Sequence, residues 1–507
     1  MTTFATTLLL GGRIHSPAAP DATAIAIRDG VVAWLGSDDV GRALHPDATV
    51  VDLEGAFVAP AFVDSHVHLT ATGLTVVGLD LRTATSLPHL LTLLAEHAAQ
   101  HPDGIIWGHG WDESGWPERV VPTTADLDGV LGGRPAYLAR VDVHSAADAA
   151  GFSAQGPLTA DAHHRVRAAA RDLLSATQRR DAQRAALDLA ARNGIVAVHE
   201  CAGPDIVGYW GEAVDDAGAA RELLARTGAH GLAGDLFIDG ALGSRTAWLQ
   251  QPYTDAPSCC GNTYLDTDAV TAHLLACTEA GTTAGFHVIG DAAVATVVEA
   301  LERTVAAFGA PAVARCGHRL EHLEMVDAEQ ARKLGAWGVV ASMQPNFDAL
   351  WGGADGMYAQ RLGVDRARGL NPFALLASQG VPLAFGSDSP VTSINPWESV
   401  RAAISHRTAG SAISARSAFL AASRGAWRAG GVRDGMTGTL VPGAVASYAV
   451  WQVPGGADAL DVTAPDDAVQ RWSTDPRSRV PVLPPLGPDD ELPTCLQTVH
   501  RGELIHG

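Results

Sequence analysis

The sequence of 507 residues predicts an α/β fold: a TIM (β/α)8 barrel with a small β-sandwich domain formed from the N- and C-terminal segments. Three observations predict this fold. Short apolar runs alternate with helical stretches through the middle of the chain, nearly every run ends in His, Asp or Glu, and both ends of the chain are rich in strand signals. Polar residues at the carboxyl ends of strands are typical of barrels that hold a site at their mouth.

The two ends of the chain share one pattern. The first sixty residues contain apolar runs broken by turn residues, such as TAIAIRDGVVAWLG with its Asp29-Gly30 turn, and the C-terminus repeats the pattern in GTLVPGAVASYAVWQV. Runs of about four to eight residues bounded by Gly, Asp and Pro are typical of strands and hairpins. We therefore expect residues 1–58 and 431–507 to form one sheet domain, with a wrapping loop near 455–494 that is rich in Pro, Asp and Gly.

The middle of the chain, residues 59–430, shows the strand and helix alternation of a barrel. The expected strands are AFVDSHVH, PAYLARVDVH, GIVAVHE, GDLFIDG, TAGFHVIG, HRLEHLEM, GVVASMQP and VPLAFGSD. Between them lie stretches such as DAAVATVVEALERTVAAFG, whose apolar residues recur at i, i+3, i+4 and i+7. A doubly wound sheet would show a similar rhythm, but the polar run ends favour the barrel. The stretch near 70–135 is too long for one crossover and predicts an insertion.

Composition narrows the class of partner. The formal net charge of −21 disfavours binding to nucleic acid or to anionic lipid surfaces, which leaves a small-molecule substrate as the expected partner. No uncharged apolar stretch approaches the ~20 residues of a membrane span, and the start of the chain does not read as a secretory signal. The six cysteines form no CxxC pair and read as reduced thiols, which predicts a cytoplasmic protein. The sequence does not decide the oligomeric state; a homodimer is possible, because dimers are the commonest closed assemblies.

Histidines and an acid at strand ends predict a metal site. His66 and His68 are two residues apart on the first run of the barrel, so both imidazoles point to the same side of that strand. His287 closes TAGFH, His322 closes HRLEH, and Asp388 closes PLAFGSD. Neutral imidazoles and a carboxylate converging on one rim are suited to a divalent ion such as zinc.

These motifs resemble the metal-dependent amidohydrolase superfamily. AFVDSHVHL is similar to its first-strand signature, and GFHVIGDAAV, HRLEHLEMV, SMQPNF and GSDSPV continue the match in order. GHGWDESGWPE, RVDVHSA and DLFIDGALGSRTA narrow the resemblance to the branch of YtcJ-like hydrolases and N-substituted formamide deformylases (amidohydrolase family 3). The resemblance runs from about residue 6 to 450. It implies a TIM barrel with an appended β-sandwich and the hydrolysis of amide-type bonds with a divalent metal.

The resemblance assigns His66, His68, His287, His322 and Asp388 to the metal centre. A zinc ion lowers the pKa of its bound water to roughly 7. Asp388 is then expected to accept the proton of that water and pass it to the leaving nitrogen, as general base and then general acid. The metal or His322 would polarise the carbonyl oxygen of the substrate. Iron and manganese suit such a site nearly as well as zinc.

One position departs from the family pattern. Many members with two metals bridge them with a carboxylated lysine on the fourth strand, where this chain has Asp235; its single lysine, Lys333, lies in a helix-like stretch. On an unchanged backbone the Asp235 carboxylate would fall ~5 Å short of the position of such a bridge. The sequence therefore favours one ion held by His66, His68, His287 and Asp388, with His322 turned to catalysis. It leaves two ions open, as well as a bridge by Asp235 or another acid.

Further residues are candidates for substrate contact. Trp107, Trp111 and Asp112 lie in WGHGWDESGW, which resembles a pocket-forming segment of the branch, and aromatic rings there would suit an apolar or aryl substrate. His144 closes RVDVH, and Arg245 in GALGSRTA is placed to clamp a carboxylate. The alternatives are packing of the Trp side chains under a lid, a buried His144, and an Arg245 that ties down its own loop.

The sequence thus predicts a zinc-dependent hydrolase that cleaves the C–N bond of an amide, an N-substituted formamide or a cyclic amide. Two rival interpretations keep the same scaffold. One is non-hydrolytic chemistry, such as decarboxylation or isomerisation. The other is a degenerate barrel that binds a ligand without turnover, and the ordered set of strand-end ligands disfavours it.

Overall fold

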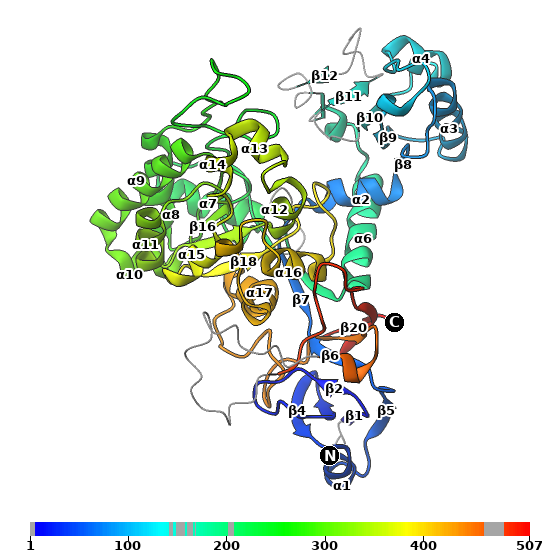
Figure 1. Cartoon of the computed structure of the whole chain (residues 1–507), viewed down its shortest axis with the longest axis vertical. Helices are drawn as coiled ribbons and strands as arrows, with labels where there is room; N and C mark the ends of the chain where they lie inside the picture. Colours follow the sequence, from blue (N-terminus) through cyan, green and yellow to red (C-terminus); the bar gives the residue numbers. More distant parts are fainter. Residues whose placement is uncertain are drawn as a thin grey trace. The chain divides into compact units, whose positions relative to one another are not determined.

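The computed structural model describes residues 6–140, 145–148, 158–159, 166–167, 169–200, 207–460 and 481–507. The chain divides into two compact units (Figure 1). Unit 1 comprises Met1–Val67, Ala190–Asp388 and Thr392–Gly507. Unit 2 comprises His68–Leu189 and Ser389–Val391, so it is longer than the insertion expected near 70–135.

N-terminal strands form one sheet of unit 1, and strands from both ends of the chain form a second. One sheet has the order β4-β3-β1-β5, made of β1 (Thr6–Leu10), β3 (Ala24–Arg28), β4 (Val31–Gly36) and β5 (Thr49–Asp52). The other has the order β2-β6-β19-β20-β21, made of β2 (Arg13–Ile14), β6 (Phe57–Pro60), β19 (Tyr448–Gln452), β20 (Thr494–His500) and β21 (Glu503–His506). The N-terminal β6 pairs antiparallel with the C-terminal β19, Val58 opposite Val450.

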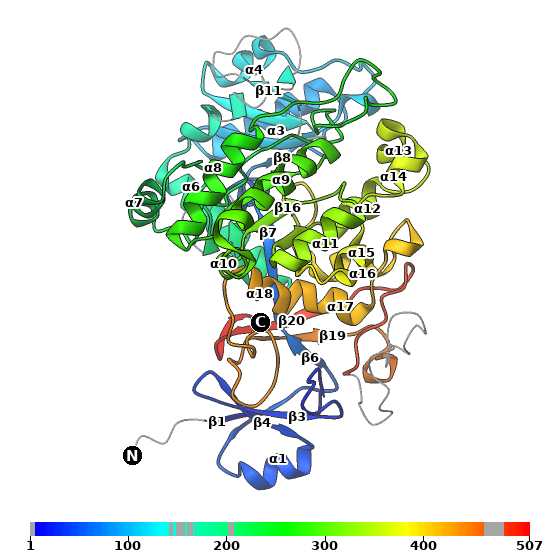
Figure 2. The same cartoon turned by 90° about the vertical axis from the view of Figure 1, so that its left-hand side faces the viewer.

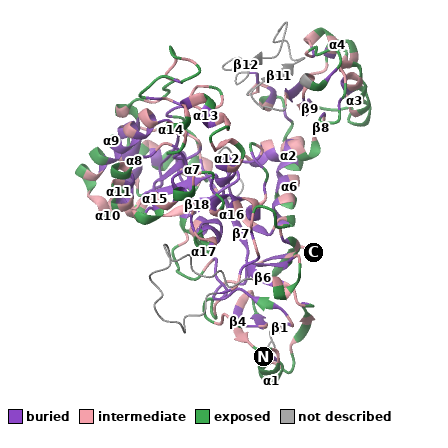
Figure 3. Cartoon of the chain, viewed as in Figure 1, coloured by how far each residue is buried: buried purple, intermediate pink, exposed green. Residues whose placement is uncertain are grey.

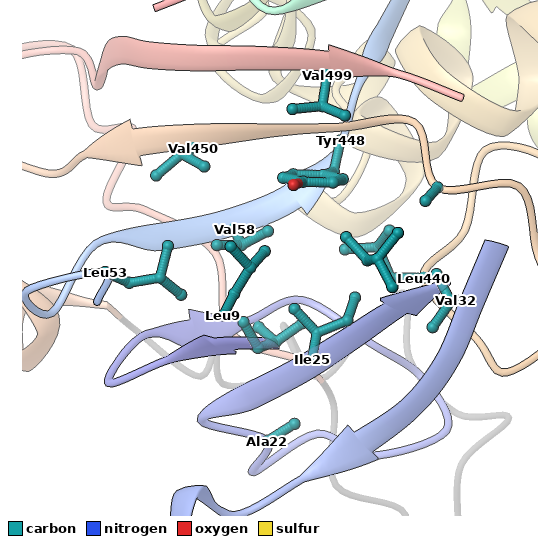
Figure 4. Packing of buried hydrophobic residues seen from close by; sticks show 13 residues of the cluster. Leu9, Ala22, Ile25, Val32, Leu53, Val58, Leu440, Tyr448, Val450 and Val499 are labelled. Atoms are coloured by element: carbon teal, nitrogen blue, oxygen red, sulfur yellow. The ribbon is translucent and has the colours of Figure 1, made fainter. Parts of the chain in front are cut away.

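One hydrophobic cluster lies between these two sheets. Figure 4 shows Leu9, Ile25 and Val32 on the first sheet facing Val58, Tyr448 and Val499 on the second. Figure 2 shows helix α1 (Asp38–Leu44) on the outer side of the first sheet. The predicted hairpin turn is confirmed: Asp29 and Gly30 have φ values of 52° and 71°, which a tight β3–β4 connection requires.

Parallel strands form the rest of the core of unit 1. β7 (Phe62–Val67), β13 (Ile195–Glu200) and β14 (Val207–Gly208) make one sheet. A second sheet consists of β15 (Gly285–Val288), β16 (Arg319–His322), β17 (Val340–Met343) and β18 (Leu383–Phe385). Parallel bridges through segment 231–238 join β14 to β15, since Tyr209 pairs with Gly231 and Leu232 with Ala284. On the other side, the Asp388 N–H donates to the His66 carbonyl over 2.8 Å, which joins the end of β18 to β7.

Helices follow these strands with the predicted periodicity. α9 (Asp291–Phe308) buries Val294, Val297, Val298 and Leu301, the i, i+3, i+4, i+7 face expected from the sequence. α8 (Thr267–Ala280) and α11 (Ala328–Trp337) each begin after an Asp whose side chain caps the helix, Asp266 and Asp327. The strands between the helices are buried, as Figure 3 shows for β7 and β18. Their carboxyl ends are therefore the places where polar side chains of this unit meet.

Unit 2 has its own sheet, with the order β12-β11-β10-β9-β8. Its strands are β8 (Leu79–Asp80), β9 (Ile106–Trp111), β10 (Ala136–Arg140), β11 (Ser145–Asp148) and β12 (Leu158–Thr159). Helices α2 (Leu69–Val77), α3 (Leu87–Gln100), α4 (Thr124–Leu131) and most of α6 (Ala176–Arg192) belong to the same unit. The sequence prediction for PAYLARVDVH was wrong: β10 pairs with β9 and β11 in this sheet and not with the parallel strands of unit 1.

Candidate metal centre

Five polar side chains of unit 1 stand at the carboxyl ends of its parallel strands. His66 is on β7, His287 on β15 and His322 at the end of β16, while Asp388 follows β18 and Asp235 lies in the bridged segment before β15. All three imidazoles are buried. Because parallel strands end at one edge, residues far apart in sequence meet there.

Distances between the side chains show that they converge. One ligand atom each of His66, Asp235 and His322 lies within 4.8 Å of the other two. His66 Nε2 is 3.3 Å from Asp388 Oδ1, and His287 Nδ1 is 3.6 Å from Asp235 Oδ1. The His322 ring centroid is 5.1 Å from that of His66 and 4.4 Å from that of His287. Three imidazoles and two carboxylates thus gather in one cluster, within which His66, Asp235 and His322 have the spacing that a divalent cation needs.

In each imidazole, the ring nitrogen that points away from the cluster forms a hydrogen bond. His66 Nδ1 donates to Glu321 Oε2 over 2.8 Å, and His322 Nδ1 donates to Gln344 Oε1 over 2.7 Å. His287 Nε2 donates to the Gly240 carbonyl over 3.2 Å. The other nitrogen of each ring then carries a lone pair and faces the cluster, which is the arrangement that metal-ligating histidines require. The residues present therefore fit a bound metal.

Electrostatics keep the His322 imidazole neutral. Its burial and the neighbouring His287 lower the pKa of His322 to about 4. Burial also disfavours the charged form of His287, but the Asp235 carboxylate outweighs this effect and raises the pKa of His287. A cation placed between these groups would take over the role of the proton and favour a neutral His287 beside an ionised Asp235.

The backbone at the centre is unusual. Asp235, His322 and Asp388 have φ values of 52°, 70° and 53°, in the left-handed region that side chains other than glycine rarely adopt. Such conformations cost of order 1–3 kcal/mol each and are found where a site imposes them. Asp64 braces the same region, since its Oδ1 accepts from the backbone N–H of His66 at 3.1 Å and of Ser387 at 3.0 Å.

The estimate that the Asp235 carboxylate falls ~5 Å short assumed a fourth strand of unchanged, extended geometry. The structure differs, because Asp235 lies in a bridged segment with left-handed φ and not in a regular strand. Its carboxylate is thereby brought to His66 and His322. The nearby Asp239 accepts hydrogen bonds from the backbone N–H groups of Trp248, Ile289 and Gly290.

The remaining candidates fall in several places. His68 is the first residue of unit 2, one position beyond the division after Val67, and its role as a ligand stays a prediction. His144 lies outside the described residues. Arg245 forms hydrogen bonds of 3.0 and 2.7 Å with Asp255, and its role as a clamp for a substrate carboxylate stays a prediction. Asp112, in unit 2, accepts a hydrogen bond from Arg140 over 3.0 Å.

Trp107 and Trp111 belong to hydrophobic clusters of unit 2, and their contact with substrate stays a prediction. Trp111 is fully buried, and its indole N–H donates to the Leu138 carbonyl over 2.9 Å. Trp107 is 7% exposed and packs against Tyr137 with ring centroids 4.4 Å apart. These contacts agree with the alternative interpretation, in which the two Trp side chains serve packing.

Replacing Trp111 with Ala is expected to lower the free energy of unfolding of unit 2 by about 3–5 kcal/mol, because a large cavity is left in its core. Urea unfolding followed by circular dichroism checks this. Val120, 46% exposed in the same unit, provides the control, since Val120→Ala should change stability by less than about 0.5 kcal/mol. A Trp111→Ala protein as stable as the Val120→Ala protein would contradict the packing role.

The fold and the cluster together define a class: an α/β protein with a histidine and aspartate metal centre at the carboxyl ends of parallel strands. Comparison with protein families agrees with this class. Residues 49–506 match the model of the amidohydrolase family, and the chain belongs to that family.

Relatives and solved structures are consistent with this membership. YtcJ of Bacillus subtilis is 28% identical over 438 residues, which cover 75% of this chain and 80% of YtcJ. The N-substituted formamide deformylase of Arthrobacter pascens is 30% identical over 146 residues, 27% of each chain. A metal-dependent hydrolase from Pyrococcus furiosus has a similar fold, with a TM-score of 0.73 and 24% identity over 88% of this chain and 98% of its own.

The family and the residues of the centre show a hydrolytic enzyme that depends on a divalent metal. The predicted enzyme class and family are thereby confirmed. Among the helices of the described residues, none has the length and apolar character needed to cross a membrane.

Proposed function

We propose that the enzyme cleaves a C–N bond of an amide, an N-substituted formamide or a cyclic amide. The observation that supports this most is the convergence of His66, His322 and Asp235, with His287 and Asp388 beside them, in a chain of the amidohydrolase family. The deformylase of Arthrobacter pascens makes N-substituted formamides the first substrates to try. We also propose that β18 and β7 close the parallel strands into a (β/α)8 barrel.

The centre is proposed to hold one zinc ion, with iron and manganese as alternatives of similar ligand preference. His66 and His322 would bind it through Nε2 and His287 through Nδ1, because the other nitrogen of each ring forms the hydrogen bond described above. Asp235 adds an anionic ligand that the sequence argument had placed out of reach. The bound ion would supply a water of lowered pKa and polarise the carbonyl group of the substrate.

Asp388 is the proposed general base and acid. It is 6% exposed and its Oδ1 lies 3.3 Å from His66 Nε2, so it borders the position where the ligand atoms meet. A carboxylate in that place can accept the proton of the attacking water and return it to the leaving nitrogen. His322, whose Nδ1 already donates to Gln344, presents a lone pair inward and is better suited to bind the metal than to donate to a carbonyl oxygen.

Exposed aromatic side chains beside the centre favour an apolar or aryl group in the substrate. The centroid of the Phe237 ring lies 4.5 Å from that of the His287 ring, yet 45% of Phe237 is exposed. Tyr264 is 51% exposed, and its ring centroid lies 6.4 Å from that of Phe237. Exposed rings next to buried ligands provide an apolar surface for a substrate group in place of the one expected from Trp107 and Trp111.

Replacing Phe237 with Ala is expected to lower kcat/KM for an N-benzyl amide by about 10- to 100-fold, because burial of a Phe side chain contributes about 1.5–3 kcal/mol. The same variant should leave kcat/KM for an N-methyl amide within about threefold of that of the unmodified enzyme. Phe308→Ala, at a Phe on α9 that is 39% exposed, is the control. Equal losses on both amides would show that Phe237 has no part in selecting the apolar group.

Hydrolysis itself is tested with a panel of N-substituted formamides, linear amides and cyclic amides in ¹⁸O-labelled water. The proposal expects one labelled oxygen in the carboxylate product. Turnover without incorporation of label would point to the non-hydrolytic alternative, decarboxylation or isomerisation. A metal-loaded protein that binds a panel member but turns over none of the panel would favour the ligand-binding alternative.

A further inference from the structure

A guanidinium group lies fully buried beneath the metal centre. Arg319, the first residue of β16, has no exposed surface, and neither has Glu321 two residues further along the same strand. Arg319 Nε donates to Glu321 Oε1, and its Nη2 donates to Glu321 Oε2 over 3.1 Å.

The Arg319 side chain also connects neighbouring strands. Its Nη2 donates to the Ser65 carbonyl of β7 and, over 2.9 Å, to the Ser342 hydroxyl of β17. Its Nη1 donates to His199 Nδ1 of β13 over 3.1 Å, and the group lies 4.6 Å from the centroid of the Tyr209 ring. A side chain held by so many partners has a fixed position, and it fixes the carboxylate that it binds.

Glu321 connects this pair to the metal centre. While both of its oxygens accept hydrogen bonds from Arg319, Oε2 also accepts from His66 Nδ1 at 2.8 Å. A carboxylate has no proton to donate, so His66 must carry its hydrogen on Nδ1. The lone pair of His66 is therefore on Nε2, the nitrogen that faces Asp388.

We infer that Arg319 and Glu321 are positioning residues that fix the tautomer and ring orientation of His66, and that they thereby set the affinity of the centre for its divalent metal. The inference rests on the proposed metal role of His66. It goes beyond the ligands themselves, because neither side chain touches the ion. A buried ion pair of this kind contributes little net stability compared with apolar residues of similar volume, so a positioning role gives a reason for its presence.

The variant Glu321→Gln tests the inference. An amide offers one acceptor oxygen, yet two groups donate to this position, and Arg319 cannot give up its proton. The amide N–H₂ must then face His66, whose Nδ1 becomes an acceptor and whose Nε2 takes the hydrogen. That hydrogen occupies the lone-pair direction that the metal needs. The expected loss of zinc affinity is about 10- to 100-fold, the usual effect of removing a partner that orients a ligand.

A double variant separates positioning from folding. Arg319→Met combined with Glu321→Leu replaces the ion pair by apolar side chains, which buried sites often tolerate without loss of stability. Its metal-free form should melt close to the unmodified protein, while its zinc affinity falls as in Glu321→Gln because His66 Nδ1 has lost its acceptor. Asp348→Asn is the matched control: Asp348 is also buried beside a histidine, 3.5 Å from His406 Nδ1, and its loss should leave zinc affinity unchanged.

Zinc affinity is measured on the full chain by competition with a chromogenic chelator, and melting of the metal-free forms is measured in parallel. The inference requires a 10- to 100-fold loss in the double variant at near-normal melting temperature. Unchanged affinity in either Arg319/Glu321 variant overturns it, as does an equal loss in Asp348→Asn. Because no substrate is used, normal zinc binding by an enzyme without amide hydrolysis would overturn the proposed function and leave this inference standing.

Discussion

The Asp388→Asn enzyme is expected to lose about 10²–10⁴-fold in kcat/KM for amide hydrolysis, the usual contribution of a positioned general base and acid. An amide oxygen cannot accept the proton of the attacking water at neutral pH and has none to return to the leaving nitrogen. The substitution is nearly isosteric, and the backbone N–H of Asp388 still donates to His66. The loss should therefore be found mainly in kcat, measured at saturating substrate and with the zinc content of the protein determined in the same sample.

The control is Asp327→Asn, because Asp327 caps helix α11 and Asn caps helices equally well. That variant should retain full activity. If Asp388→Asn retained full activity with a full complement of zinc, the acid–base assignment would be wrong. Loss of zinc together with loss of activity would mean that Asp388 acts chiefly as a ligand.

Removal of the metal is expected to abolish turnover and to lower the stability of unit 1. Incubation with a strong chelator, followed by its removal, should leave less than about 1% of the activity, because the centre supplies both the attacking water and the polarised carbonyl. A ligand that binds only the folded state stabilises it by about 2.7 kcal/mol at one hundred times its dissociation constant. Activity and melting temperature should thus fall together, and both should return on addition of stoichiometric zinc.

Magnesium is the control for this experiment, since it prefers an all-oxygen octahedral site and is poorly suited to three imidazoles. Activity should not return with magnesium alone. A metal-free protein, verified by elemental analysis, that still hydrolysed amides at the original rate would contradict the metal-dependent mechanism.

Much of the centre could be predicted from strand-end residues. His66, His287, His322 and Asp388 could be found because parallel strands bring their carboxyl ends to one edge, whatever the details of the loops. Asp235 could not be placed, because the reach of a side chain was judged from an extended strand and the backbone there is left-handed. Nor could the sequence show that Glu321 accepts a hydrogen bond from His66. It spans 255 positions in sequence, and only the assembled strands bring the two side chains together.

Errors elsewhere have the same physical origin. The run PAYLARVDVH looks like any buried strand, and nothing local shows that it pairs with β9 in a separate sheet. Trp111 and Phe237 are both large aromatic side chains, yet one is fully buried and the other 45% exposed. Which ring meets solvent depends on the elements packed around it, and periodicity carries no information on that point.

The most direct test of the account is the metal content of the protein. Plasma mass spectrometry on protein purified without chelators or metal-affinity resin should find close to one zinc, iron or manganese per chain. His66→Ala protein prepared in the same way should contain much less. Protein that holds no metal, even after incubation with zinc, would contradict the assignment of His66, Asp235, His287, His322 and Asp388 to a metal centre. Two metals per chain would contradict the single-ion arrangement.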